Sequence, residues 1–120
     1  MAKRPAKKQP KKKINSRAKG CAAELEFSKV LMARNIEARR GQQFSGGTDS
    51  PDVISALTDV HFEVKRVEAG NLYKWMKQAV RDAKHKKPVV AHRKNKEDWV
   101  AIVPMEFMLD LLILREGSLI

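Results

Sequence analysis

The segment PDVISALTDVHFEVK, residues 51–65, decides the fold of this chain. Apolar and polar residues alternate from Val60 to Lys65, and this period of two predicts a β-strand. Val53 to Ala56 predicts a preceding strand, and Thr58-Asp59 predicts the turn between the two. The segment is therefore expected to form an antiparallel hairpin that brings its first residues back beside its last.

Polar side chains of this hairpin are predicted to converge on one spot. Because side chains alternate across a strand, Glu63 and Lys65 point to the same face, which His61 shares. Asp52, at the start of the earlier strand, is expected to return close to Glu63. The opposite face of the later strand is predicted to be buried and consists of Val60, Phe62 and Val64.

Helices and further strands are predicted on both sides of the hairpin. Apolar residues at helical spacing predict helices at 21–35, 72–86 and 105–114. Short apolar runs predict strands at 36–40, 89–92 and 99–103. The second helix is expected to begin after Asn71 as its N-cap and to end before Pro88. The first helix carries two neighbouring apolar stripes, one of Ala22, Leu25 and Met32 and the other of Ala23, Phe27, Val30 and Leu31.

This order of elements predicts an α/β fold in which one mixed sheet of about five strands is flanked by helices. The chain has 120 residues, which leaves room for one domain, expected at 16–120. Gly41 to Pro51 is rich in glycine and serine and is predicted to be a loop.

Positive charge is concentrated at the start of the chain. The net charge is +11, yet residues 1–19 hold nine Lys or Arg and no acid, and the remainder has sixteen bases against fourteen acids. Residues 1–15 cannot bury enough apolar surface to fold alone and are predicted to be a disordered basic arm. Such an arm suits DNA, because neutralised phosphates release counterions; a solubilising or targeting tail is the alternative.

Asp52 and Glu63 predict a metal site. Two carboxylates that converge repel each other unless a cation lies between them. Mg²⁺ suits this arrangement, because it takes one or two carboxylates, several waters and phosphate oxygens, and Mn²⁺ is the expected substitute. A lysine at position 65 would orient a metal-bound water or stabilise charge on a phosphate. The alternative is a half-exposed strand with ordinary surface charges.

Three further features favour the metal site. Glu24 falls on an apolar helix face, where an acid is costly to bury without a partner, although an acid that reaches solvent from the helix edge is the alternative. Arg39 or Arg40, with Ser45 and the glycine backbone after it, offers donors for phosphate oxygens, unless the segment is only a connection. Gln78 lies beside the apolar stripe of the second helix, either bonded to an active-site group or exposed to solvent.

Together these motifs resemble the PD-(D/E)xK nuclease superfamily, within which the chain is most similar to the archaeal-type and phage-encoded Holliday junction resolvases. The resemblance extends over about residues 16–104. The loop between Arg40 and Asp52 is longer here than in the short archaeal enzymes. The motifs that carry the resemblance are Lys19-Gly20, Glu24, Arg40, the Gly/Ser loop, Pro51-Asp52-Val53, Glu63-Val64-Lys65, Gln78, Pro88 to Ala91 and Trp99 to Val103.

The resemblance implies a restriction-endonuclease-like core and a set of catalytic roles. Asp52 and Glu63 would bind the metal together with the backbone carbonyl of Val64, and Glu24 would complete the acidic cluster. Lys65 would act on the attacking water or on the phosphate. Supporting roles would fall to Gln78, and to Arg40 and Ser45 at the phosphate. DNA contacts are expected from Lys11, Lys12, Lys13, Arg17, Lys19, Arg39, Arg40 and Arg66.

The helix predicted at 105–114 is unusually apolar. One helix on a small domain cannot bury so many apolar residues internally, which favours a homodimer interface; full packing on the sheet is the alternative. Resolvases of the resembled type act as symmetric dimers. Trp75, Trp99 and Phe107 lie within apolar stripes, so core packing is favoured over base stacking.

Other features narrow the setting. Cys21 is the only cysteine, so an internal disulfide is excluded and a reducing compartment is the simple inference. The histidines lack the spacing of a zinc site, and His61 is expected to lie at the edge of the active site. No membrane partner is expected, because no apolar run approaches the length of a membrane span. The cytoplasm of a bacterial, archaeal or phage-infected cell is the predicted location.

These observations lead to one principal hypothesis and two alternatives. The principal hypothesis is a Mg²⁺-dependent, structure-selective endodeoxyribonuclease that resolves four-way junctions by paired nicks. The second is another nuclease of the same superfamily, acting in restriction, repair or phage DNA processing on duplex or branched DNA. The third, from a different class, is a non-catalytic DNA-binding module.

Overall fold

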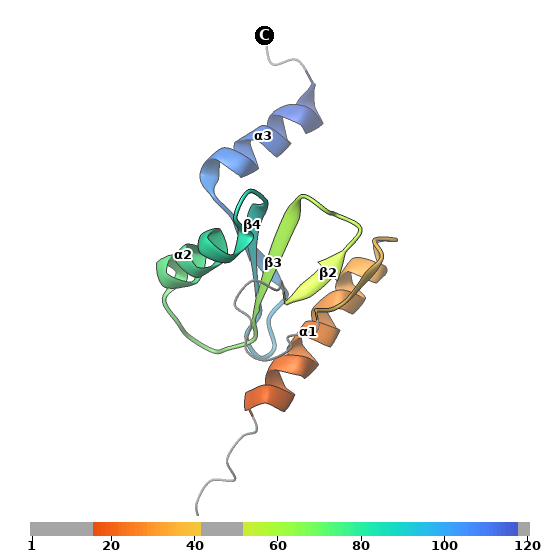
Figure 1. Cartoon of the computed structure of the whole chain (residues 1–120), viewed down its shortest axis with the longest axis vertical. Helices are drawn as coiled ribbons and strands as arrows, with labels where there is room; N and C mark the ends of the chain where they lie inside the picture. The colour runs from red at the N-terminus through yellow and green to blue at the C-terminus, as the bar shows by residue number, and fades with distance from the viewer. Residues whose placement is uncertain (1–15, 42–51, 118–120) are drawn as a thin grey trace, which may run out of the picture.

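The computed structural model describes residues 16–41 and 52–117. Within them the chain forms three helices and five strands (Figure 1). In chain order these are α1 (Ser16–Met32), β1 (Ala38–Arg40), β2 (Val53–Ser55), β3 (Val60–Lys65), α2 (Leu72–Ala83), β4 (Lys87–His92), β5 (Val100–Ile102) and α3 (Met105–Glu116).

The five strands form one mixed sheet in the order β1-β2-β3-β4-β5. Each neighbouring pair is antiparallel except β3 and β4, which are parallel with Glu63 opposite Val90. A parallel pair needs a crossover connection, and α2 supplies it. The predicted α/β class with a mixed five-stranded sheet is therefore confirmed, as is the antiparallel pairing of the two hairpin strands.

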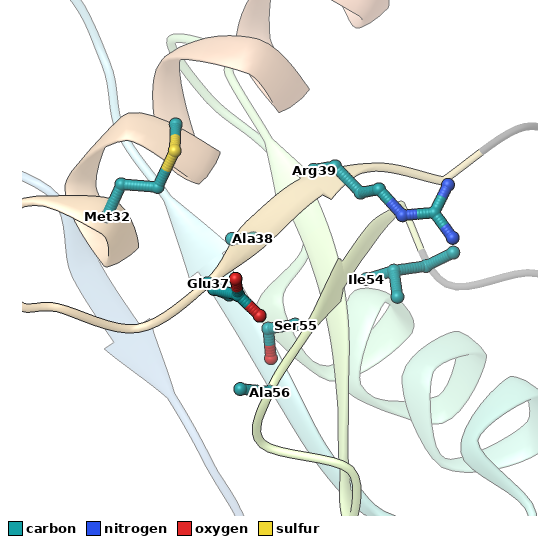
Figure 2. Close-up of a pocket in the computed structure, with 7 residues that line it drawn as sticks. All are labelled: Met32, Glu37, Ala38, Arg39, Ile54, Ser55 and Ala56. Atoms are coloured by element: carbon teal, nitrogen blue, oxygen red, sulfur yellow. The ribbon is translucent and has the colours of Figure 1, made fainter.

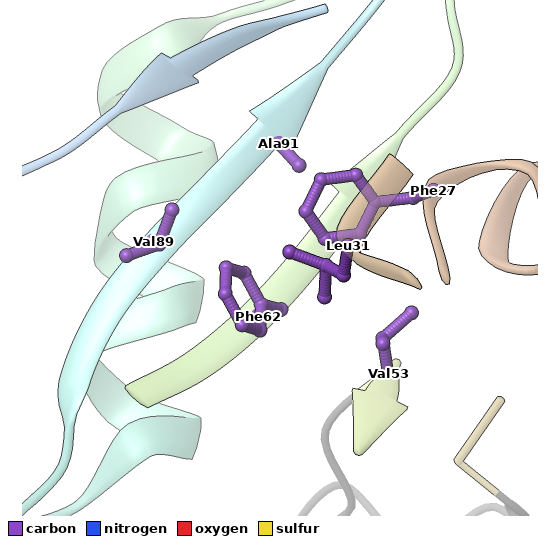
Figure 3. Close-up of a cluster of buried hydrophobic side chains, with 6 residues drawn as sticks. All are labelled: Phe27, Leu31, Val53, Phe62, Val89 and Ala91. Atoms are coloured by element: carbon purple, nitrogen blue, oxygen red, sulfur yellow. The ribbon is translucent and has the colours of Figure 1, made fainter. Parts of the chain in front are cut away.

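Helix α1 covers one face of the sheet (Figures 1 and 3). Of its two predicted apolar stripes, the buried one contains Ala23, Phe27 and Leu31, whereas Leu25 and Met32 of the other are exposed. The Phe27 ring lies 5.2 Å, centroid to centroid, from the rings of both Phe62 and Trp99. The core cluster consists of Phe27, Leu31, Val53, Phe62, Val89 and Ala91.

Helix α2 lies against the other face, because the side chains of β3 that alternate with Phe62 contact α2 residues. Asn71 caps the helix as predicted, its side chain accepting a hydrogen bond from the Lys74 N–H at 3.1 Å. The helix ends at Ala83, where Lys84 adopts a positive φ of 56°. The predicted end at residue 86 was therefore three residues too late.

Pro88 lies inside β4, so the prediction that it only terminates the preceding helix was wrong. Proline lacks the N–H donor of a strand interior and is tolerated where no neighbour needs that donor. At this position β4 pairs with β3 alone, because the pairing with β5 begins at Val90. The predicted strand at 89–92 consequently starts two residues earlier, at Lys87.

Helix α3 extends away from the sheet (Figure 1). Phe107 packs partly against the core cluster, but no α3 residue is buried. The alternative of full packing on the sheet is therefore wrong within this chain. Its large exposed apolar side chains are Met105, Leu109, Leu111, Leu112, Ile113 and Leu114.

Within the described residues, no helix combines the length and the apolar character required to cross a membrane.

Candidate active site

Asp52 is held in place by backbone groups on three sides. Its N–H donates to the carbonyl of Phe62 at 3.1 Å, and its own carbonyl accepts from the Gly41 N–H at 2.9 Å. Its carboxylate Oδ2 accepts from the Val64 N–H at 2.7 Å. The hairpin thus fixes this carboxylate against β3, beside the buried Glu63, as the sequence predicts.

Burial and neighbouring acids raise the pKa of Asp52. Burial raises its pKa to about 7, and repulsion from Glu63 acts in the same direction. The hydrogen bond from Val64 opposes the rise, whereas the nearby charge of Glu24 adds to it. Asp52, Glu63 and Glu24 are therefore coupled electrostatically as one acidic cluster, with Asp52 directly before β2, Glu63 on β3 and Glu24 on α1.

Glu63 is the most enclosed member of the cluster, with 3% of its surface exposed. One carboxylate oxygen, Oε1, lies 2.9 Å from Nε2 of His61, which is also buried. His61 was expected only at the edge of the site, yet it contacts a central acid. Both faces of β3 are buried, so this histidine does not reach solvent and pairs with Glu63 instead.

Asp82 is a site residue that the sequence analysis missed. It lies on the buried face of α2 with Ala79 and Ala83, and its carboxylate pairs with Arg81 at 3.0 Å. The signal was available, since an acid on an apolar helix face is the pattern that singled out Glu24. Donor atoms of His61, Glu63 and Asp82 all lie within 4.8 Å of one another.

Two candidate sets of metal ligands share Glu63, and among the described residues only His61, Glu63 and Asp82 bring three donor atoms within 4.8 Å of one another. The set of Asp52, Glu63 and Glu24 offers oxygen atoms only, the preference of Mg²⁺. The set of His61, Glu63 and Asp82 includes an imidazole and would suit a transition metal, although its atoms already bond to one another and to Arg81. Asp52, which belongs to the all-oxygen set, has a raised pKa, and a bound cation would stabilise its ionised form.

Glu24 pairs with a cation, Arg40, which offsets the cost of placing an acid on an apolar face of α1. Nε of Arg40 lies 3.1 Å from its Oε2, and this hydrogen bond raises the pKa of Arg40. Nη2 of the same arginine lies 2.8 Å from Sγ of Cys21. The Arg40 side chain is 42% exposed. Arg40 can therefore meet a phosphate beside the acidic cluster, as its predicted role requires.

Lys65 and Gln78 meet across the β3–α2 contact. Nζ of Lys65 donates to Oε1 of Gln78 at 3.1 Å. Sequence spacing alone left Gln78 equally placed at the surface or at the site, and the structure resolves this choice in favour of the site. Gln78 therefore contacts a candidate site residue, and its role in catalysis stays a prediction.

Arg39 does not join the cluster. It lines a hollow of about 500 Å³ at the β1–β2 edge, among Met32, Ile54 and Ser55 (Figure 2). Adjacent strand residues point to opposite sides, so Arg39 and Arg40 cannot both face the acids. Lys19 and Arg66 lie closer to the cluster, in a groove that also includes Lys65.

Some predicted contacts fall outside the described residues. These are Ser45 in the Gly/Ser loop, together with Lys11, Lys12 and Lys13 of the basic arm. Arg17 belongs to the first turns of α1.

The chain matches no family model, no curated protein and no solved structure. Its chemistry must therefore be inferred from its own side chains.

Proposed function

We propose that this protein is a Mg²⁺-dependent endodeoxyribonuclease with its active site at Asp52, Glu63 and Lys65. The observation that carries the proposal is the pKa of Asp52, raised to about 7 by burial and by the neighbouring Glu63. Folding brings these acids together at a cost in free energy, and strongly perturbed groups in contact concentrate at functional sites. The adjacent lysine, held by Gln78, supplies a cationic donor for the same chemistry.

The residues fit a magnesium ion. A divalent cation between Asp52 and Glu63 would relieve their repulsion and take hard oxygen ligands from two adjacent strands. Glu24 would add a third carboxylate, directly or through water, while it keeps its bond to Arg40. The proposed ligand set also includes the carbonyl of Val64, whose N–H anchors Asp52. Mn²⁺ would occupy the same site.

The bound ion would supply Lewis acidity, polarising the scissile phosphate and lowering the pKa of a bound water. Asp52 and Glu63 would hold it in position. An ammonium has three N–H donors, so the bond to Gln78 positions Lys65 without using all of them. Lys65 would orient the attacking water and stabilise charge on the phosphate as the bond to the leaving oxygen breaks. Arg40, partly exposed beside Glu24, would bind a phosphate oxygen.

The arrangement of the chain supports membership of the PD-(D/E)xK superfamily. Glu63 and Lys65 lie on β3, Asp52 directly precedes the antiparallel β2, and α2 crosses over to the parallel β4. Both features agree with the core that the resemblance implies. A basic sequence with nine cations in its first nineteen residues supports DNA as the substrate. Such an enzyme would act in the cytoplasm of a bacterial, archaeal or phage-infected cell.

Within this superfamily we favour a homodimeric Holliday junction resolvase. Helix α3 is apolar around most of its circumference yet has no buried residue, and such a helix is stable when another surface covers it. A second copy joined through α3 would provide two active sites for paired nicks in opposed strands.

A cleavage assay on a labelled four-way junction, with a linear duplex of matched sequence as control, tests the proposal. Paired symmetric nicks in the junction alone, lost when Mg²⁺ is chelated, are the expected result. Equal cutting of the duplex would retain the nuclease and reject the resolvase. Metal-independent binding without cleavage of either substrate would instead favour a non-catalytic DNA-binding module, because converging acids oppose phosphate binding when no metal is present.

A further inference from the structure

We infer that a groove between α1 and the end of β3 binds the phosphate backbone of the DNA strand that leads into the active site. This inference rests on the proposed nuclease function and adds to it the path of the substrate. The groove has a volume of about 390 Å³ and lies at one end of the sheet, where the N-terminal half of α1 approaches the last residues of β3 (Figure 1). We refer to it as the α1 groove.

The lining of the α1 groove combines apolar and cationic side chains. Ala23, Val64 and Val67 contribute apolar surface, and Lys19, Lys65 and Arg66 contribute positive charge. This lining matches a ligand that has both apolar surface and repeated negative charge. A nucleotide strand has this character, with apolar surface on its sugars and negative charge on its phosphates.

Two residues connect the α1 groove to the acidic cluster. Val64 lines the groove and donates its N–H to Asp52 at 2.7 Å. Lys65 also lines it and is bonded to Gln78 within the site. A strand seated in the groove would therefore continue directly to the metal ligands.

Arg66, which lines the α1 groove, shares its carboxylate partner, Glu26, with another arginine. Its Nε lies 3.8 Å from Oε2 of Glu26, an ion pair that is longer than a hydrogen bond, and Arg93 also pairs with Glu26. The single carboxylate of Glu26 thus pairs with two guanidinium groups, which together carry one more positive charge than it neutralises. This excess charge favours the binding of an anion from outside the protein beside Arg66.

Gly20 provides an independent indication. It lies inside α1, where glycine costs about 0.5–1 kcal/mol relative to alanine. A Cβ built on Gly20 meets no other atom within 4 Å, so internal packing does not require the small residue. Gly20 lines the α1 groove, and the absence of a side chain leaves room there for a ligand to approach the helix backbone.

Gly20→Glu is the test variant, with Ala22→Glu as its matched control. Both add the same charge to the same helix, but the two positions lie about 200° apart around its axis. Ala22 is exposed and is not among the groove residues. Gly20→Glu improves helix propensity, and Ala22→Glu lowers it only slightly at an exposed position, so thermal unfolding should show no large loss of stability in either variant.

Binding to a fluorescent four-way junction would be measured by anisotropy in Ca²⁺, and cleavage by steady-state kinetics in Mg²⁺. We expect Gly20→Glu to weaken binding and raise KM by about tenfold with kcat within about twofold, as expected for lost ground-state contacts. Ala22→Glu should change either quantity by less than about twofold. In a parallel series, Lys19→Ala should reduce the slope of log K against log salt by about one, and Lys29→Ala should leave it unchanged.

The two proposals fail in distinguishable ways. If the wild-type protein cuts DNA and both glutamate variants behave alike, the α1 groove does not hold the strand, whereas the nuclease function stands. If the wild-type protein neither binds nor cuts DNA, the proposed function and the groove are rejected together.

Discussion

Replacing Asp52 by asparagine should stabilise the metal-free protein, and by more at high pH than at low pH. The carboxyl has a pKa of about 7 in the folded protein, against an ordinary value of 3.8. A raised folded pKa gives stability that is complete below 3.8 and is lost as the pH rises through 7. Asparagine keeps an acceptor for the Val64 N–H but never ionises, so it avoids this loss.

The magnitude follows from the two pKa values. At about 1.4 kcal/mol per pKa unit, the raised pKa of Asp52 costs the fold about 4 kcal/mol at pH 8, where the folded carboxyl is ionised, and about 2 kcal/mol at pH 5, where only the unfolded chain ionises it. A weaker hydrogen bond from the Val64 N–H to asparagine would lower the stability of the variant equally at both pH values. This effect therefore cancels when the stability gains at the two pH values are subtracted. The gain from Asp52→Asn should therefore be about 2 kcal/mol larger at pH 8.

Urea unfolding in a chelator, at both pH values, measures this difference. Asp110→Asn, which removes the same charge from an exposed position on α3, should show no such pH dependence. Mg²⁺ should then close most of the gap at pH 8: at about a hundred times its Kd it stabilises wild type by about 3 kcal/mol, and Asp52→Asn much less. An equal gain at both pH values would refute the account of Asp52 as a buried, repelled acid.

Three further predictions concern catalysis, packing and assembly. Lys65→Ala should lower kcat for DNA cleavage by about 10²–10³-fold, as removal of a transition-state donor does, with Lys77→Ala near wild type; an unchanged kcat would remove Lys65 from the mechanism. Gly70→Ala should destabilise the fold by roughly 1–3 kcal/mol in thermal unfolding, because its Cβ would lie 2.0 Å from the Trp75 ring; a neutral result would show that the indole moves freely. Leu112→Glu should convert a dimer to a monomer in sedimentation experiments, and a wild-type monomer at all concentrations would exclude the α3 interface.

The hairpin at 51–65 could be predicted because its information is local. Alternation over Val60 to Lys65 sets the strand, and the short turn sets its pairing with β2. The convergence of Asp52 and Glu63 then follows from geometry alone. Lys65 was likewise placed on the correct face, since a strand side chain has only two directions to choose from.

What could not be predicted depends on contacts between distant elements. Glu63 and His61 alternate with Phe62, which suggests one exposed face, yet α2 buries that face as well. The proximity of Asp82 to Glu63 arises only once α2 is docked over β3. For the same reason, helical spacing could not tell which stripe of α1 meets the sheet, nor whether Gln78 reaches Lys65.

For helix α3, the apolar composition was predictable from the sequence, but the surface that covers the helix was not. The apolar sequence required cover, but composition cannot say whether that cover comes from the same chain or from another. Packing of Phe107 alone against the core leaves Leu111 and Leu114 exposed. The source of the missing surface is therefore a question about assembly and not about the fold of one chain.

Metal-dependent cleavage by Glu63→Gln, compared with wild type, tests the central claim most directly. The substitution removes one negative charge from the acidic cluster without changing the size of the side chain, and Glu37→Gln provides the same change at an exposed position. Purified protein would be assayed on labelled four-way junction DNA with Mg²⁺ and with chelator. We predict Mg²⁺-dependent cutting by wild type and Glu37→Gln and a loss of at least about a hundredfold in Glu63→Gln. Full cleavage by Glu63→Gln, or cleavage that persists in chelator, would contradict a metal-dependent active site at these carboxylates.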